Sequence, residues 1–201
     1  MHQFHGSLFN VKKRAWADEM LDAIDIPKEW MPRVYESPEI TGRITDEASA
    51  LTGLAPGTPV VGGGGDNAAS AVGNGIVEPG LVFSSVGTSG VVFAYADKPV
   101  VDPKLRVHTF CHAVPDKWHV MGVVLSAGGS LRWYRDTFGD AECAVARHTN
   151  RDPYEIIADE ASAVPTGSEG LIFLPYISGE RTPHADPYAR GVFFGITLRH
   201  T

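Results

Sequence analysis

The first residues of this chain that could take part in chemistry directly follow a short apolar run, residues 59–61. Four consecutive glycines, residues 62–65, are followed by Asp66 and Asn67. Glycine lets a backbone approach its neighbours closely and adopt a positive φ angle at little cost. Asp66 stands where a helix is expected to begin, beside free N–H groups and the positive end of the helix dipole. This pattern favours a general base that takes the proton of a substrate hydroxyl. The alternative is an ordinary helix N-cap.

Two further glycine turns follow along the chain. In the first, Gly87-Thr88-Ser89-Gly90, backbone N–H groups and the Thr88 hydroxyl could cradle a phosphate, and the alternative is a simple hairpin loop. In the second, Gly128-Gly129 could bring a helix N-terminus to a nucleotide or could only permit close packing of helix on strand. Because no Gly-Lys-Ser or Gly-Lys-Thr occurs, the P-loop class is excluded. A carboxylate in one turn and phosphate-binding groups in another suggest phosphoryl transfer to a hydroxyl.

Four side chains superficially look like a metal-binding set: His108, Cys111, His112 and His119. No Cys-x-x-Cys pair accompanies them, and two cysteines cannot build an ordinary zinc ribbon. We therefore predict no metal site and expect these side chains to line or pack beneath the active site. Residues 178–190 are dense in charge, and Glu180 and Arg181 are expected to shape a loop at a domain interface or cleft rim. A solvated turn is the alternative.

The elements that must position these residues follow from periodicity and turn signals. Residues 97–117 contain three prolines and are predicted to be an irregular excursion. The strand-like run at residues 191–198 is followed almost at once by the end of the sequence, so we expect a fragment of a longer protein. Helices are predicted over residues 16–25, 45–53, 66–75, 131–138 and 153–162, and strands over residues 59–62, 81–86, 91–95, 118–125 and 171–177.

Composition excludes several classes of protein. The net charge is −7 and the Lys and Arg residues are not clustered, which argues against a nucleic-acid surface. No apolar stretch reaches the roughly 20 residues that a membrane span needs, and no signal peptide is visible. Two cysteines in 201 residues favour a reduced, cytoplasmic setting. The oligomeric state is open, and a homodimer is allowed.

Taken together, these segments resemble the FGGY family of carbohydrate kinases over nearly the whole chain. Phe110-Cys111-His112-Ala113 with Trp118-His119 is similar to the xylulokinase members of the family, more than to gluconokinases or glycerol kinases. The most specific stretches are residues 62–73, 84–90, 108–112, 118–121, 126–133 and 175–184.

The resemblance implies an α/β fold of the actin-like ATPase, ribonuclease-H-like type, with parts of two domains. Residues 1–77 would be the end of the first domain and residues 78–201 the start of the second. The implied reaction is ATP-dependent phosphorylation of a ketopentose, D-xylulose to D-xylulose 5-phosphate, with Mg²⁺ bridging the phosphates. The implied roles are Asp66 as catalytic base and sugar ligand, Asn67 as a second sugar ligand, and Gly87, Thr88, Ser89, Gly128 and Gly129 on the nucleotide side.

The sequence also departs from the family pattern. No Asp-x-Gly-Thr phosphate motif occurs, and the later glycine-rich adenosine motif is absent. We therefore expect the fragment to be inactive alone. The alternatives are a family kinase for ribulose, gluconate or glycerol, and a non-catalytic remnant that kept the fold.

Overall fold

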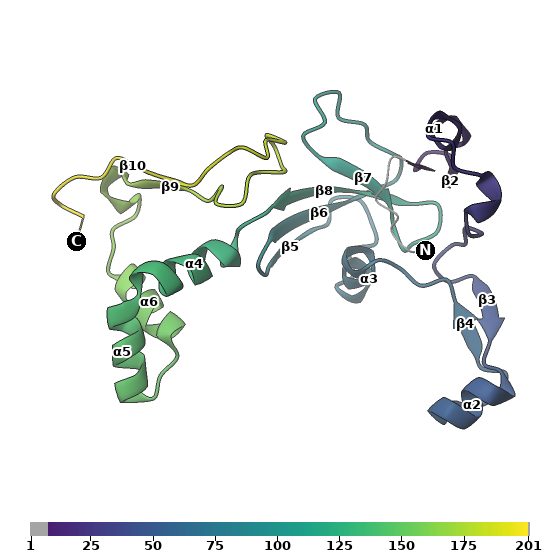
Figure 1. Cartoon of the computed structure of the whole chain (residues 1–201), viewed down its shortest axis with the longest axis horizontal. Helices are drawn as coiled ribbons and strands as arrows, with labels where there is room; N and C mark the ends of the chain where they lie inside the picture. The colour runs from purple at the N-terminus through teal and green to yellow at the C-terminus, as the bar shows by residue number, and fades with distance from the viewer. Residues whose placement is uncertain (1–7, 201) are drawn as a thin grey trace. The chain divides into compact units, whose positions relative to one another are not determined.

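The computed structural model describes residues 8–200, which form short helices and strands (Figure 1). The strands are β1 Phe9–Asn10, β2 Ala15–Trp16, β3 Ile40–Arg43, β4 Pro59–Val61, β5 Val82–Val86, β6 Gly90–Ala96, β7 His108–Cys111, β8 Trp118–Val124, β9 Ile172–Leu174 and β10 Val192–Phe194. The α-helices are α1 Asp18–Ala23, α2 Asp46–Thr52, α3 Asp66–Gly73, α4 Gly128–Phe138, α5 Asp140–Thr149 and α6 Pro153–Ser162, and two single 3₁₀ turns span Lys28–Trp30 and Ser168–Gly170.

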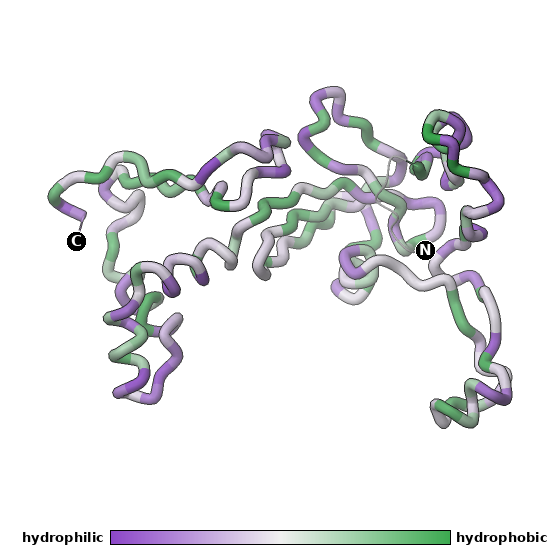
Figure 2. Tube along the Cα trace, viewed as in Figure 1, coloured by the Kyte–Doolittle hydropathy of each residue, from purple (hydrophilic) through white to green (hydrophobic). Residues whose placement is uncertain are grey.

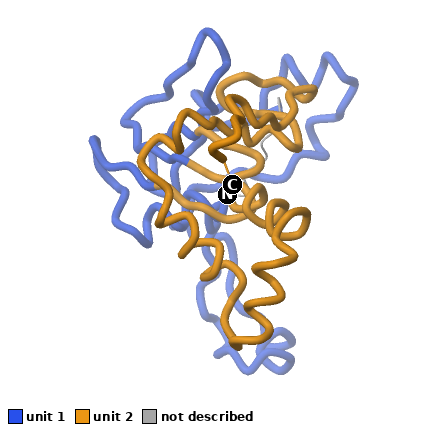
Figure 3. The backbone as a smooth tube through the Cα atoms, turned by 90° about the vertical axis from the view of Figure 1, so that its left-hand side faces the viewer, with its two compact units in different colours: residues 1–83, 92–121 blue, residues 84–91, 122–201 orange. Residues whose placement is uncertain are grey.

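The chain divides into two compact units (Figure 3). The first holds the chain up to residue 83 together with residues 92–121, and the second holds residues 84–91 and the chain from residue 122 onward. Strands β5, β6 and β8 therefore each contribute residues to both units. The predicted domain boundary between residues 77 and 78 stays a prediction.

The largest sheet has four strands in the order β5-β6-β8-β7. Strands β7 and β8 are antiparallel, with His108 opposite Met121 and Cys111 opposite Trp118. The prediction that residues 97–117 are wholly irregular is therefore wrong, because residues 108–111 form a strand. These four residues contain no proline and include the β-branched Thr109 and the aromatic Phe110, so they can pair along the edge of β8.

A small apolar core in the first unit carries helix α3 on the sheet. Ala71 of α3 and Phe93 of β6 are completely buried, and Ile76 packs with them. Phe83 stacks on Phe93 with ring centroids 4.9 Å apart. Hydrophobic residues predominate in β5, β6 and β8 (Figure 2). Small residues on the buried face of α3 let the helix approach the sheet closely. This packing against the sheet holds the helix, and with it Asp66 at its start, in position.

Helix α2 shows how local signals set the ends of an element. Thr45 is its N-cap, and the Thr45 hydroxyl accepts a hydrogen bond from the Ala48 N–H at 3.1 Å. Gly53 ends the helix in the left-handed conformation, with φ of 76°. The prediction of a helix between Thr45 and Gly53 is confirmed.

The second unit contains three successive helices and the β9–β10 pair. Helix α5 was not predicted from the sequence, whereas α6 lies where a helix is expected, with Asp152 as its N-cap. Phe173 of β9 stacks on Phe193 of β10 at 4.7 Å between ring centroids, and Trp133 of α4 lies parallel to Phe173 at 6.3 Å. Among residues 8–200, no helix has both the length and the apolar character needed to cross a membrane.

Candidate active site

The Asp66 loop, residues 62–67, connects strand β4 to helix α3 in the first unit. Gly65 is the N-cap of α3 and Asp66 is the first helical residue, so the alternative of Asp66 as an N-cap is not what the structure shows. Gly63 has a φ angle of 70°, which side-chain-bearing residues rarely adopt. The loop therefore delivers Asp66 at the N-terminal end of the helix.

The glycines of this loop are needed because backbone and side chains press against them. A Cβ atom on Gly62 would lie 2.6 Å from the Glu36 carbonyl oxygen, and one on Gly64 would lie 3.3 Å from the Ala113 Cβ. The Gly62 N–H donates to the Glu39 carbonyl at 2.9 Å, and the Gly63 N–H donates to the Ser37 carbonyl at 3.0 Å. The loop is thus packed between residues 36–39 on one side and Ala113 on another.

The Asp66 carboxylate is exposed and is oriented by its neighbour. Its Oδ1 accepts hydrogen bonds from the Asn67 backbone N–H at 2.7 Å and from the Asn67 Nδ2 at 3.2 Å. Its Oδ2 accepts none from the part of the chain that the structure describes. One oxygen is therefore held in place while the other can accept a proton from a hydroxyl.

His112 ties a neighbouring turn to the far end of α3. The side chain is 2% exposed, its Nε2 lies 3.1 Å from the Ile76 carbonyl, and its Nδ1 accepts the Val114 N–H at 3.0 Å. A carbonyl can only accept, so Nε2 carries the proton and Nδ1 is bare. Burial lowers the pKa of His112, against a smaller opposing effect of the bond to Ile76. His112 therefore acts as a neutral structural link.

The histidines that superficially resemble a metal-binding set, His108, His112 and His119, contact one another or neighbouring aromatic rings. His119 is fully buried and stacks on Phe93 at 4.1 Å between centroids, while His108 stacks on Phe110 at 5.9 Å. Within residues 8–200, no three His, Cys, Asp or Glu side chains are placed to share a metal ion.

The Thr88 turn, residues 87–89, connects β5 and β6 in the second unit and rests on the start of helix α4. The Gly128 N–H donates to the Gly87 carbonyl at 2.9 Å, and the N–H groups of Ala127 and Gly129 both donate to the Thr88 carbonyl, at 2.9 and 3.0 Å. A Cβ atom on Gly128 would lie 2.5 Å from the Gly87 oxygen. The structure thus brings together all five residues predicted on the nucleotide side.

These bonds change which groups of the turn can bind a phosphate. The first N–H groups of α4 are already used on the turn, so Gly128 and Gly129 serve the close packing that was the alternative interpretation of that pair. The Gly87 N–H is also used, by the Ser89 carbonyl at 2.9 Å. In the described chain, the N–H groups of Thr88 and Ser89 and the Thr88 hydroxyl have no partner. These three donors make the candidate anion site.

The charged loop at residues 178–190 supports the same region from within the second unit. Glu180 is 3% exposed, and its Oε1 accepts the N–H groups of Arg181 and Thr182 at 2.7 and 3.0 Å. The hydroxyls of Ser178 and Ser126 lie 2.6 Å apart, just before α4 begins. The alternative of a solvated turn is therefore wrong for Glu180, which shapes the loop from inside.

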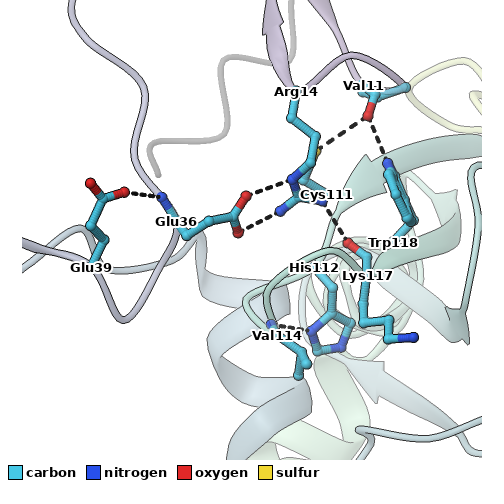
Figure 4. A network of polar contacts seen from close by, with 9 residues as sticks. All are labelled: Val11, Arg14, Glu36, Glu39, Cys111, His112, Val114, Lys117 and Trp118. Carbon is cyan, nitrogen blue, oxygen red and sulfur yellow. Dashed lines mark hydrogen bonds and ion pairs between the residues drawn. The ribbon is translucent and has the colours of Figure 1, made fainter.

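Sequence reasoning missed a polar network that involves the Asp66 loop. The Arg14 guanidinium forms two hydrogen bonds to Glu36, whose own carbonyl contacts the loop (Figure 4). The two residues are 22 positions apart and neither lies in a motif. No spacing rule could have paired them.

Comparison with known proteins gives matches over both parts of the chain. A sequence model of the FGGY family of carbohydrate kinases, N-terminal domain, matches residues 5–73, and one of the C-terminal domain matches residues 82–201. The chain is 44% identical to the xylulose kinase of Escherichia coli (strain K12) over 191 residues, which are 95% of this chain and 37% of that protein.

Two solved structures from Lactobacillus acidophilus are similar in fold. The ligand-bound xylulose kinase matches with a TM-score of 0.83 at 31% identity, and the gluconate kinase with a TM-score of 0.84 at 31% identity. Each match covers 96% of this chain and 37% of the other. The chain thus spans little more than a third of the length of the relatives that it matches.

Proposed function

The chain belongs to the FGGY family of carbohydrate kinases, and from this membership we propose that its protein transfers the γ-phosphoryl group of ATP to a hydroxyl of a ketopentose. D-Xylulose is the proposed acceptor and D-xylulose 5-phosphate the product, because similarity to proteins named xylulose kinase extends over nearly the whole chain. The proposed partners are the sugar and ATP, and the proposed location is the cytoplasm.

The observation that carries the proposal is the Asp66 carboxylate, exposed at the start of α3 with one oxygen held by Asn67 and the other able to accept. In the proposed step, a sugar hydroxyl gives its proton to Asp66 while its oxygen forms a bond to the γ-phosphorus. The bond from that phosphorus to the bridging oxygen breaks, and ADP leaves with the electron pair. A base in this position typically contributes about 10²–10⁴-fold.

The Thr88 turn is the proposed contact for the phosphates of the nucleotide. Its donors are the Thr88 and Ser89 N–H groups and the Thr88 hydroxyl, fixed by the bonds from Ala127, Gly128 and Gly129. Such preorganised donors stabilise charge that develops on phosphoryl oxygens. ATP would enter as its Mg²⁺ complex, because Mg²⁺ is usually bound by substrate phosphates together with only one or two carboxylates. The ion would neutralise charge on the phosphates.

A second candidate substrate is gluconate. The gluconate kinase of Lactobacillus acidophilus matches the fold as well as the xylulose kinase does. D-Xylulose is a five-carbon ketose, whereas gluconate is a six-carbon acid that carries a carboxylate at C1. A non-catalytic remnant is the other alternative, and it predicts no sugar-dependent turnover at all.

The test is sugar-dependent ADP release from Mg-ATP by the protein expressed from its full reading frame. We expect D-xylulose to stimulate release more than gluconate, ribulose or glycerol. Asp66→Asn should lower kcat by about 10²–10⁴-fold. Asp46→Asn is the matched control, because Asp46 is also the exposed first residue of a helix in the same unit but lies in no glycine loop.

Each outcome separates the candidates. Preference for another sugar retains the kinase and replaces the substrate. An unimpaired Asp66→Asn variant with active wild-type protein removes Asp66 as the base. Absence of turnover with every sugar favours the remnant.

A further inference from the structure

Arg14 stands between two segments that hold the Asp66 loop. Its Nε and Nη2 each donate to one oxygen of the Glu36 carboxylate at 2.6 Å, and its Nη1 donates to the Lys117 carbonyl at 3.0 Å (Figure 4). Its guanidinium also lies over the Trp118 ring, 5.2 Å from the centroid. All of these residues belong to the first unit.

The Arg14–Glu36 pair is partly buried. The Arg14 side chain is 11% exposed and the Glu36 side chain 29%. Two parallel hydrogen bonds between a guanidinium and a carboxylate fix direction as well as distance, which a lysine cannot reproduce. The pair is therefore able to set the position of what is attached to it.

On one side, Glu36 leads directly to the glycines. The Glu36 carbonyl oxygen is the atom that a Cβ on Gly62 would meet at 2.6 Å. One residue further, the Ser37 carbonyl accepts the Gly63 N–H at 3.0 Å. Moving the Glu36 backbone would move the loop with it, because Gly62 leaves no space in between.

On the other side, Lys117 leads to the turn that contacts the same loop. The Lys117 carbonyl accepts both Arg14 Nη1 and the His112 N–H, the latter at 2.8 Å. That turn presents Ala113 to Gly64, and His112 bonds to Ile76 beyond the end of α3. Arg14 thus joins the two supports between which Gly62 and Gly64 are packed.

We propose that the Arg14–Glu36 pair is a positioning device for Asp66, the base of the proposed kinase reaction. The pair touches no substrate: it fixes the spacing of the two segments that hold the glycine loop, and so the place from which Asp66 reaches the sugar hydroxyl. This inference rests on the proposed function. A pair that only stabilises the fold is the competing explanation.

The test compares Arg14→Met, Arg14→Lys and Glu36→Gln with Arg106→Met. Arg106 is the matched control, because its Nε and Nη2 bond to the Asp102 carboxylate at 2.9 and 3.1 Å in the same unit without contacting the glycine loop. Glu36→Gln keeps the side-chain shape and remains informative if Arg14→Met fails to fold. Two readouts are taken on folded protein: sugar kinase kinetics and amide hydrogen exchange at residues 62–69.

We expect Arg14→Met and Glu36→Gln to lower kcat about ten- to hundredfold, the scale that small misplacements of a catalytic group produce. KM for ATP should stay unchanged, Arg14→Lys should not restore kcat, and exchange at residues 62–69 should quicken. Arg106→Met should change neither readout. In the Asp66→Asn background, Arg14→Met should cost much less, because the group that it positions is already gone.

Loss of thermal stability with unchanged kcat and unchanged exchange at the loop would overturn the proposal in favour of a purely structural pair. A wild-type protein without kinase activity would refute the proposed function separately. In that case faster exchange in Arg14→Met would show that the pair positions the loop, and unchanged exchange would refute that as well.

Discussion

At the residue scale, His112 should make the stability of the fold depend on pH. Its Nδ1 accepts the Val114 N–H and its Nε2 donates to the Ile76 carbonyl, an arrangement that only the neutral imidazole can make. Burial lowers the pKa of His112 below its ordinary value of 6.5. At pH values between the lowered pKa of His112 in the folded chain and its ordinary pKa, the unfolded chain therefore binds a proton more readily than the folded chain does.

The contribution of neutral His112 to the free energy of unfolding should therefore be fully present above about pH 6.5. The free energy of unfolding should fall as the pH drops below that value. His112→Gln, which does not titrate but can still donate to Ile76, should show a shallower decline. Urea unfolding between neutral and mildly acidic pH measures both proteins. Parallel curves for the two would show that His112 does not cause the decline.

Single residues could be predicted from the sequence where their signal is local. Asp66 and Asn67 stand out because the glycines and the helix start are adjacent in the chain. Arg14 could not be predicted, since its partners Glu36 and Lys117 come together only through folding. The roles of Asp66 and Asn67 in sugar binding remain predictions.

At the scale of elements, the contact of helix α4 with the Thr88 turn depends on Gly128. Gly128→Ala would place a methyl group 2.5 Å from the Gly87 oxygen, so the helix and the turn must separate. We expect destabilisation of about 1–3 kcal/mol and weaker binding of Mg-ADP. Gly73→Ala in α3, where nothing lies within 4 Å of the added Cβ, should instead be neutral or stabilise by roughly 0.5–1 kcal/mol.

Thermal unfolding and nucleotide titration of the two variants provide the measurement. Equal stability of Gly128→Ala and wild type would mean that the close approach is not needed. Unchanged Mg-ADP affinity in a destabilised Gly128→Ala would remove the Thr88 turn from the nucleotide side.

Helices α2 and α6, whose caps are readable in the sequence, were predicted well, whereas strand β7 and helix α5 were not. Helix α2 has a threonine cap and a terminal glycine, both readable in the sequence. Strand β7 forms because it pairs with β8. It was not predicted, because the prolines elsewhere in residues 97–117 indicated irregular structure. Helix α5 was missed because its apolar residues are mostly small, and because Asn150, which ends it in the left-handed conformation, is not a glycine.

At the scale of the whole molecule, family membership confirms the predicted fold class, an α/β fold of the actin-like ATPase, ribonuclease-H-like type. The candidate residues fall in both compact units. Asp66 and Asn67 belong to the first, and the Thr88 turn with Gly128 and Gly129 belongs to the second. This division follows from which residues contact one another, and periodicity in the sequence does not report it.

Because of this division, binding of nucleotide and catalysis should be separable by mutation. Mg-ADP at about 100 times its Kd should stabilise the folded full-length protein by about 2.7 kcal/mol. Asp66→Asn should keep this stabilisation while losing turnover, since its changed side chain lies in the other unit from the proposed phosphate donors. Gly128→Ala should lose most of it.

Thermal shift with and without Mg-ADP, read beside the kinetics of the same variants, decides the matter. The opposite pattern, in which Asp66→Asn abolishes the nucleotide shift, would mean that Asp66 acts on the phosphates and would contradict its assignment to the sugar hydroxyl. If both variants keep the full shift, the nucleotide is held by groups other than the Thr88 turn. The proposed reaction then needs a different donor site, while the base could remain where α3 begins.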